Sequence, residues 1–380
     1  MNKKAIAILG VIFLLIVGTL GFLIYQKYSA KPTVVTVKNT LGDASSTTPA
    51  TDSTANPVPA AGGAMLTKLS DEQVLSPVLF FDGTGITYFT PEGKLNQADL
   101  TINGTSVQLS RKRGLDIKIK SGISKILWPV TGRNFIAQQN TGIKKIWSFF
   151  NNSIGDYIDL PQQIASLDWA PQGDKIYYIW DENGKATLNS SDPDNKNWKF
   201  IATMWEQDDE IKVSPDGQNI LYFETANTAS SSNPIYLTTP DGKVWRTVVG
   251  DGYNFGVLWS PDSQKFIFSK KDKSSGNYQL WYANILTGLT KNLGIFTIPE
   301  KVVWSFDSKT IYAAAPTVGV AGTGQLTQDT VFRMNTDTFD RKEYTGFSQQ
   351  VDVEDLLLTK DGSNLLFRNA QDGYLYYLGL

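Results

Sequence analysis

Two short acidic clusters contain the residues whose types and spacing could do chemistry in this sequence: Asp208, Asp209 and Glu210 in one, and Asp352, Glu354 and Asp355 in the other. Neighbouring carboxylates attract a cationic group, and they can also serve as general acid and base. Their oxygen atoms suit a hard cation such as Ca²⁺. Nothing further in the sequence supports Ca²⁺, so we expect no metal site and no cofactor. The alternative interpretation is that both clusters are solvated charges at the entrance of a channel.

The complete absence of histidine and cysteine narrows the chemistry further. The chain has 380 residues, with 35 Lys and Arg against 37 Asp and Glu, and contains neither His nor Cys. There can be no Ser-His-Asp or Cys-His catalytic site, no zinc site with thiolate or imidazole ligands, and no disulfide. The formal net charge of −2 gives no reason to expect nucleic-acid binding.

The elements that must position the acidic clusters are repeated along the chain from residue 66 to residue 380. The repeat is clearest in the turns at residues 213–217 and 259–263, each followed by a short apolar strand. Similar turns recur at intervals of 41 to 54 residues and end at Gly85, Gly132, Gly173, Gly217, Ser263, Ser308 and Gly362. Seven units of about 45 residues match the blades of a β-propeller.

One unit consists of a tight Ser-Pro-Asp-Gly turn between two short strands, since Pro presets φ and Asp hydrogen-bonds to nearby backbone. The strand after the turn is apolar on both faces, as at residues 220–223, which indicates a sheet buried between two neighbours. We interpret the turn carboxylates as structural: Asp216, Asp262, Asp307 and Asp361. We interpret the tryptophans before the turns as blade-packing residues: Trp128, Trp169, Trp259 and Trp304.

The Trp-Ser-Pro-Asp-Gly/Ser turn followed by an apolar strand resembles the WD40-like repeat of TolB-type β-propellers, over residues 66–380. The resemblance implies a propeller used mostly as an interaction platform, often outside the cytoplasm. Some relatives carry a peptidase domain after the propeller, and we expect none here. The last unit has only three strands, so residues 65–69 are expected to supply its fourth and close the ring.

The amino terminus is predicted to be a membrane segment. An uncharged apolar run from residue 5 to residue 25 would span roughly 31 Å as a helix, close to the thickness of a bilayer. We therefore expect three parts: a cytoplasmic tip and transmembrane anchor at 1–28, a disordered Ser/Thr/Pro/Ala-rich linker at 29–64, and a propeller at 65–380. The length of the run favours an uncleaved anchor over a cleaved signal peptide. The charges on either side of the run are nearly equal. A cytoplasmic propeller on the same anchor is therefore the alternative.

The predicted architecture is thus an all-β seven-bladed β-propeller preceded by one transmembrane helix and a disordered linker. Connections between blades emerge on the same face as the loops between second and third strands, and both acidic clusters fall there. We predict a non-catalytic, membrane-tethered platform outside the cytoplasm, binding a protein, peptide or glycan of the cell envelope. The alternative is a carboxylate-dependent glycosidase or lyase acting at the propeller channel.

Overall fold

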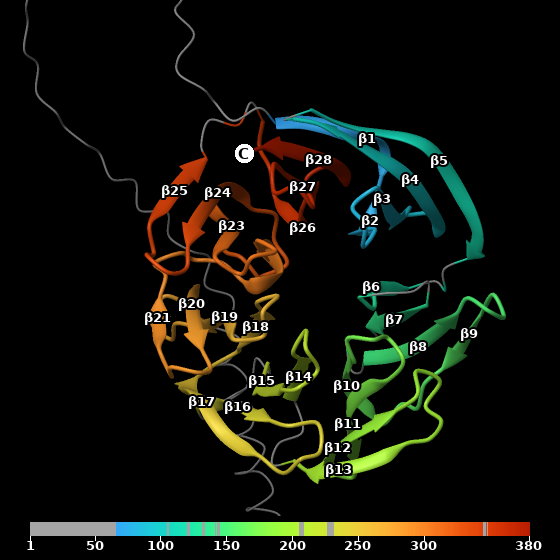
Figure 1. Cartoon of the computed structure of the whole chain (residues 1–380), viewed down its shortest axis with the longest axis vertical. Helices are drawn as coiled ribbons and strands as arrows, with labels where there is room; N and C mark the ends of the chain where they lie inside the picture. Colours follow the sequence, from blue (N-terminus) through green and yellow to red (C-terminus); the bar gives the residue numbers. More distant parts are fainter. Residues whose placement is uncertain are drawn as a thin grey trace, which may run out of the picture. The chain divides into compact units, whose positions relative to one another are not determined.

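The computed structural model describes residues 66–380, apart from gaps at 105, 119, 121, 131–133, 141, 143–144, 205–208, 226–231, 345–346 and 348. Its described strands form seven four-stranded antiparallel sheets around a central channel (Figure 1). The predicted all-β seven-bladed propeller is therefore confirmed. The predicted anchor and linker lie outside the described residues. Within the described part of the chain, no helix is long and apolar enough to cross a membrane.

Each blade is one sheet, numbered here in chain order. Blade one contains β2 (Leu75–Leu79), β3 (Gly85–Phe89), β4 (Lys94–Asn103) and β5 (Ser106–Lys118). Blade two contains β6 (Ile123–Leu127), β7 (Phe135–Asn140), β8 (Lys145–Asn151) and β9 (Asp156–Asp159). Blade three contains β10 (Ile164–Trp169), β11 (Ile176–Glu182), β12 (Lys185–Ser191) and β13 (Lys199–Thr203). Blade four contains β14 (Asp209–Val213), β15 (Ile220–Glu224), β16 (Asn233–Thr238) and β17 (Trp245–Gly252).

The second half of the ring follows the same order, with the first strand of each sheet nearest the channel (Figure 1). Blade five contains β18 (Gly256–Trp259), β19 (Lys265–Lys271), β20 (Tyr278–Asn284) and β21 (Thr290–Asn292). The 3₁₀ turn η1 (Pro299–Lys301) leads into blade six, which contains β22 (Val302–Trp304), β23 (Thr310–Val318), β24 (Gln328–Asn335) and β25 (Arg341–Tyr344). Blade seven contains β26 (Val353–Leu358), β27 (Asn364–Asn369), β28 (Tyr374–Gly379) and β1 (Leu66–Gln73).

The ring closes through blade seven, whose outer strand comes from the other end of the propeller sequence. Strand β1 pairs antiparallel with β28, and Leu66 lies opposite Leu378 in the register. This is the closure expected from the three-stranded last unit. It pairs the outer edge of β28, which would otherwise expose unpaired backbone groups.

The turn between the first and second strands has the same hydrogen bonds in several blades. In blade four, the Gly217 amide donates to the Ser214 carbonyl, and the Ser214 hydroxyl donates to Asp216 Oδ1 at 2.5 Å. In blade one, the equivalent turn residue is Gly83, with φ 78°, because its amide donates to the Phe80 carbonyl. The repeat spacing pointed to Gly85 instead, which is wrong by two residues, since Gly85 already begins β3.

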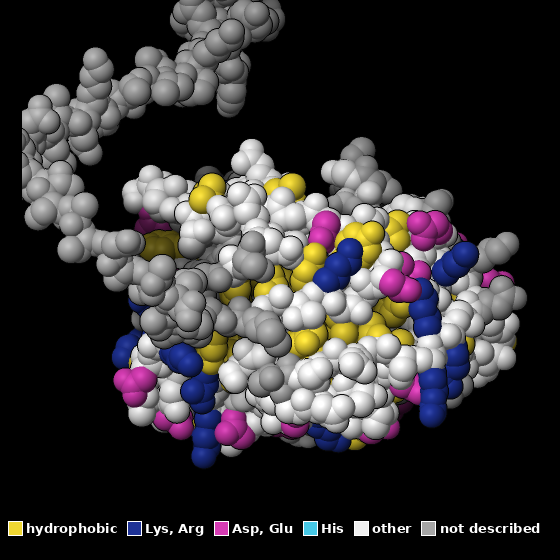
Figure 2. Space-filling view, turned by 90° about the horizontal axis from the view of Figure 1, so that it is seen from above, with side chains coloured by type: hydrophobic (Ala, Val, Ile, Leu, Met, Phe, Trp, Pro, Cys, Tyr) yellow, Lys and Arg dark blue, Asp and Glu magenta, His cyan; other side chains and the backbone are white. Residues whose placement is uncertain are grey.

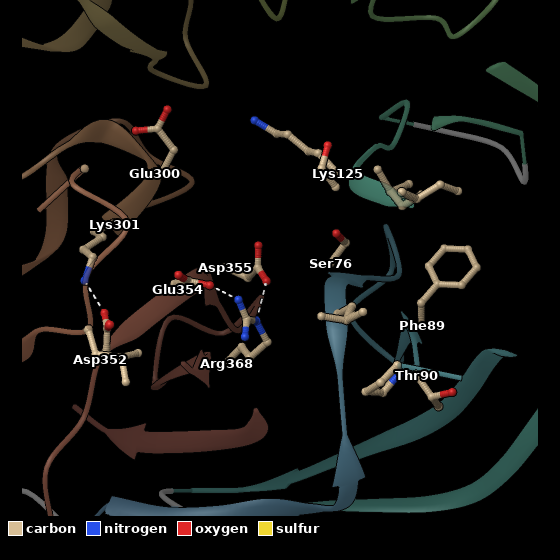
Figure 3. A pocket seen from close by; sticks show the side chains of 18 of the residues that line it. Ser76, Phe89, Thr90, Lys125, Glu300, Lys301, Asp352, Glu354, Asp355 and Arg368 are labelled. Carbon is tan, nitrogen blue, oxygen red and sulfur yellow. Dashed lines mark hydrogen bonds and ion pairs between the residues drawn. The ribbon is translucent and has the colours of Figure 1, made fainter. Parts of the chain in front are cut away.

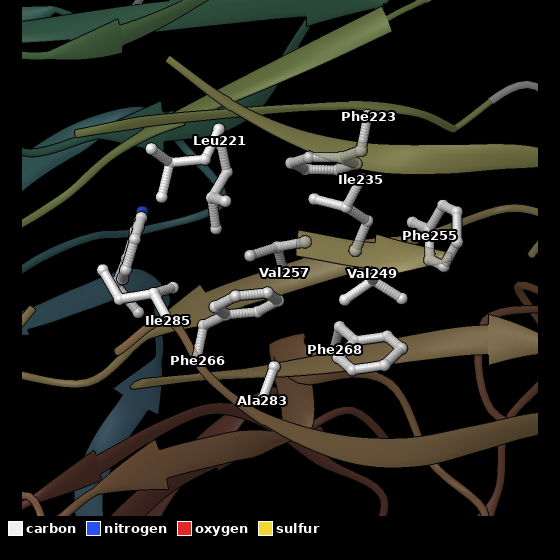
Figure 4. Packing of buried hydrophobic residues seen from close by; sticks show 12 residues of the cluster. Leu221, Phe223, Ile235, Val249, Phe255, Val257, Phe266, Phe268, Ala283 and Ile285 are labelled. Carbon is white, nitrogen blue, oxygen red and sulfur yellow. The ribbon is translucent and has the colours of Figure 1, made fainter. Parts of the chain in front are cut away.

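The core lies between adjacent blades, because the second strand of a blade is apolar on both faces. Leu221 and Phe223 of β15 pack toward blade five, whereas Ile220 and Tyr222 of the same strand pack toward blade three. Figure 4 shows the cluster between blades four and five, where Phe223 lies across from buried residues of β18 and β19. The blades are therefore held side by side by apolar burial.

The four tryptophans that precede the turns add a polar link between neighbouring blades. Each indole N–H donates to a backbone carbonyl in the innermost strand of the preceding blade. The pairs are Trp128 to Ser76 at 3.2 Å, Trp169 to Leu127 at 3.0 Å, Trp259 to Lys212 at 3.0 Å and Trp304 to Leu258 at 3.4 Å. The indole ring and its N–H group thus both hold one blade against the next.

The outer surface near blades seven and one carries charges of both signs. Figure 2 shows basic and acidic side chains interspersed on the face that it presents, with neither sign collected in a continuous patch. The three basic residues of β5 at positions 111–113 are all paired with carboxylates. Lys112 Nζ lies 2.6 Å from Glu72, and Arg111 and Arg113 lie 3.7 and 3.2 Å from Asp99.

Candidate functional site

A cavity of about 730 Å³ lies in the channel, toward the face from which the connections between blades emerge (Figure 3). Its walls come from blades one, two, six and seven and from the segments before their first strands. The carboxylates that line it are Glu92, Glu300, Asp352, Glu354 and Asp355. The cations that line it are Lys120, Lys125, Lys301 and Arg368. The site is therefore mixed in charge.

The innermost strands are bulged where they meet this cavity. The pairing register shifts once in each of three innermost strands. The shift lies between Leu75 and Val78 in β2, between Ile123 and Lys125 in β6, and between Glu354 and Leu357 in β26. Ser76 and Asp355 adopt left-handed backbone conformations there, with φ 46° and 51°. Such conformations cost energy in residues other than glycine, and bulges redirect side chains beside functional sites. The bulge in β26 turns Asp355 into the cavity (Figure 3).

Arg368 of β27 holds the two carboxylates of the bulge. It makes an ion pair with Glu354, and its Nε lies 3.3 Å from Asp355 Oδ2. Burial raises the pKa of Asp355 to about 6, and Lys125 acts in the opposite direction. A carboxyl with such a pKa exchanges protons close to neutral pH, which an ordinary aspartate does not.

A buried ion cluster forms the wall on the side of blades six and seven. Lys301 Nζ lies 2.7 Å from Asp329 Oδ2 and 2.5 Å from Asp352 Oδ1. The Thr327 hydroxyl hydrogen-bonds with both carboxylates, and the Thr327 amide donates to Asp352 Oδ2 at 2.9 Å. The side chains of this cluster (Lys301, Thr327, Asp329 and Asp352) hydrogen-bond with one another. The cluster therefore holds the wall in place and leaves few hydrogen-bonding groups free for a ligand.

Lys125 of β6 is the cation of the cavity with no ion pair or hydrogen bond among the described residues. Its side chain is accessible to water but lies inside the channel, directed toward Glu300 on the opposite wall (Figure 3). Burial and the neighbouring Lys212 lower its pKa, while Glu300 and Glu210 act to raise it. The ammonium group is therefore placed to receive an anionic group from a ligand.

A smaller hollow of about 230 Å³ continues the channel toward blades four and five and shares Lys125 and Glu300 with the main cavity. Glu210 lies there and pairs with Lys145 of β8 at 2.5 Å. Burial acts to raise the pKa of Glu210, but Lys145 and Lys212 outweigh it, and the pKa is lowered. This carboxylate therefore stays ionised and partnered.

The described members of the two predicted acidic clusters lie in two parts of the channel. Glu210 lies in the smaller hollow, and Asp352, Glu354 and Asp355 line the main cavity. Asp208 is outside the described residues, and of Asp209 only the backbone, at the start of β14, is described. Every described member has a cationic partner, either Lys145, Lys301 or Arg368. Whether these residues bind a ligand remains a prediction.

Sequence reasoning did not single out the cations of the site, Lys125, Lys301 and Arg368, because each stands alone in the sequence. A weak signal existed for Lys125, which interrupts the apolar pattern of a first strand. The turn carboxylates Asp216, Asp262, Asp307 and Asp361 lie away from the cavity and each accept the amide two residues further on. Among the described residues, no group of three or more carboxylates lies close enough together to hold a metal ion.

No protein-family model and no curated protein matches this sequence. Solved structures do match its fold. An oligogalacturonate lyase, solved in complex with manganese, is 13% identical over 84% of this chain and 94% of its own, with a TM-score of 0.59. The β-propeller domain of Cps50 (Swd1) from Myceliophteria thermophila is 9% identical over 83% of this chain and all of its own, with a TM-score of 0.54.

TolB from Acinetobacter baumannii is 15% identical over 78% of this chain and 79% of its own, with a TM-score of 0.43. All three identities are low. The TM-scores for the lyase and for the Cps50 domain show a shared β-propeller architecture. A fold shared at such low identity does not by itself assign an activity.

Proposed function

We propose that this chain is a non-catalytic binding platform that holds a protein or peptide segment in the channel cavity. In this proposal residues 5–25 tether it to the cell membrane, and the propeller lies outside the cytoplasm, where its partner belongs to the cell envelope. The support for the tether is the apolar run in the sequence. A reporter fused after Leu380 that is active only outside the cytoplasm tests this orientation.

The observation that carries the binding role is the ammonium group of Lys125, which has no ion-pair or hydrogen-bond partner in the described part of the chain, in a cavity of about 730 Å³. Glu300 and Asp355 lie on the walls facing it (Figure 3). A peptide segment that carries both an anionic and a cationic group would pair with Lys125 and with these carboxylates together. Ligand-binding sites are typically concave and largely preformed, and a small number of polar groups in them point toward the ligand.

Site-specific photo-cross-linking in the native membrane tests this proposal. A photoreactive residue at Gln325, which lines the cavity, should capture a discrete partner, and Lys125→Glu should abolish that capture. The matched control is Lys243→Glu, since Lys243 is an exposed lysine that pairs with Asp241 on a surface turn. A photoreactive residue at Asp241 should capture nothing. Equal capture from both positions, or capture that survives Lys125→Glu, would contradict the proposal.

A second candidate is a carboxylate-dependent lyase or glycosidase, and one observation favours it. The pKa of Asp355 is about 6, beside Glu354 and opposite Lys125, whose pKa is lowered. Such groups suit general acid and base catalysis near neutral pH. The similar lyase acts on oligogalacturonate, so that compound is the substrate to test. Formation of an unsaturated product that Asp355→Asn abolishes would favour the enzyme over the platform.

A further inference from the structure

Blade three carries a second cleft at its rim that shares no lining residue with the channel. The cleft has a volume of about 720 Å³ and lies over one face of β11, β12 and β13. Its aromatic lining consists of Tyr178, Trp180, Trp198 and Phe200. Trp198 is 64% exposed and Phe200 is 58% exposed, and the two lie in one cleft. A patch of exposed apolar side chains is more informative than a single one.

The strand register explains why these side chains share a face. Trp180 lies opposite Thr187, and Asn189 lies between Tyr178 on one side and Phe200 on the other. The inner part of this face is covered, because Tyr178 packs against residues of blade two such as Trp147. Blades diverge from the centre of a ring toward its rim, so the outer part of the same face is left open.

The loop before β13 is held in one shape, and it places Trp198 at the edge of the cleft. Asn195 and Asn197 have left-handed backbones, with φ 61° and 52°. The Asn195 amide donates to the Asp192 carbonyl at 2.9 Å, and Asn197 Nδ2 donates to Asp192 Oδ2 at 2.7 Å. Asparagine adopts the left-handed conformation readily in turns, so these hydrogen bonds hold the loop in an ordinary, well-defined turn. A loop that is fixed before binding lowers the entropy cost of binding a ligand.

The polar lining is rich in amides and balanced in charge. Asn183, Asn189 and Asn195 line the cleft, and its two charged residues, Glu182 and Lys185, lie opposite each other in the register. Asn195 Oδ1 is shielded and accepts no hydrogen bond among the described residues. Buried polar atoms usually have a partner, so a hydroxyl group entering beside it could supply the missing donor.

We propose that this cleft binds an uncharged oligosaccharide. A sugar ring has an apolar C–H face and an edge of hydroxyl groups, which match the aromatic rings and the side-chain amides respectively. The balanced charge of the lining gives no preference for a charged ligand. The site is independent of the channel, so this inference does not depend on the proposed function.

Oligosaccharide titrations on the full-length chain test the inference, in a detergent without a sugar head group. The probes are cellotetraose, maltotetraose and tetra-N-acetylchitotetraose, with tetragalacturonate as the charged comparison and intrinsic tryptophan fluorescence and calorimetry as readouts. At least one uncharged probe should bind, and Trp198→Ala and Phe200→Ala should each weaken it by about tenfold or more, as for buried aromatic contacts elsewhere. Phe306→Ala, which removes a 60% exposed aromatic residue of blade six, should leave binding unchanged.

Three results would overturn the inference. These are no binding of any uncharged probe, binding that survives both cleft substitutions, and tighter binding of tetragalacturonate than of the uncharged probes. A peptide copying residues 47–64, which are rich in Thr, Pro and Ala, serves as a further comparison. If that peptide binds the cleft and the oligosaccharides do not, the cleft recognises the chain's own linker. Thermal unfolding of each variant confirms that the propeller is intact.

Discussion

Lys301 Nζ lies 2.5 Å from Asp352 Oδ1, and this contact joins blade six to blade seven. Lys301 ends η1 before blade six, and Asp352 directly precedes β26 of blade seven. Both side chains are buried, as is Asp329, the second carboxylate on the lysine. A buried ammonium group with two carboxylates and a threonine hydroxyl is stable only while every member is present.

Substituting Lys301 should therefore destabilise the propeller strongly. Lys301→Met leaves Asp329 and Asp352 buried without their cation, so the free energy of unfolding should fall by about 3–5 kcal/mol. Urea denaturation measures this change. Lys309→Met, at an exposed lysine of the same blade, should cost less than about 0.5 kcal/mol. Similar losses for the two variants would show that the ion cluster contributes nothing specific.

The raised pKa of Asp355 predicts a stability that depends on pH. Its pKa is about 6 in the folded chain, against 3.8 for an ordinary aspartate. Between these values the folded chain binds the proton more tightly than the unfolded chain. Asp355 thus contributes fully to the stability of the folded chain below about pH 4, and this contribution is lost as the pH rises through 6.

Asp355→Asn should consequently be more stable than the parent at pH 7 and equal to it near pH 4. The difference should be about 1 kcal/mol or less, because the side chain is partly exposed and water screens its charge. Thermal unfolding at several pH values is the measurement. A variant less stable than the parent at pH 7 would mean that the ion pair with Arg368 outweighs the cost of burial.

Ring closure predicts a sharp effect of shortening β1. A chain that begins at Ser70 lacks the residues whose partners are Leu378, Tyr377 and Tyr376. It also loses the partly buried side chains of Leu66 and Leu69. We expect at least about 2 kcal/mol less stability in chemical denaturation. The control begins at residue 64 and retains all of β1. Full stability of the shorter chain would reject closure through this strand.

Because their indole N–H groups form hydrogen bonds, we expect the tryptophans to stabilise the propeller by more than the packing of their rings. Trp259→Phe keeps an aromatic ring but leaves the Lys212 carbonyl without its 3.0 Å donor. The loss should be about 1–3 kcal/mol, from the missing hydrogen bond and the smaller ring together. Trp198→Phe, at an exposed tryptophan, provides the comparison in the same denaturation series and should change stability little.

The repeat spacing, the Ser-Pro-Asp turns and the doubly apolar strands were sufficient to predict seven blades and their closure by β1. They are local patterns, and each reports burial or backbone geometry within a few residues. The error at Gly85 arose because Gly83 and Gly85 both suit a turn in the sequence, and the structure distinguishes them by the hydrogen bond to Phe80 and by the positive φ of Gly83. Blade topology predicted that the acidic clusters lie on the face of the inter-blade connections, and their described members Glu210, Asp352, Glu354 and Asp355 line the channel.

Which charges meet was decided only by the tertiary structure. Lys145 of blade two and Glu210 of blade four are 65 residues apart and form an ion pair, and nothing in either local sequence indicates the other. The raised pKa of Asp355 likewise depends on a bulge in β26 and on burial between blades. By itself the sequence determined the blades, because strand periodicity and turn chemistry are short-range. The mixed charge of the channel and the open aromatic cleft depend on how separate blades face one another.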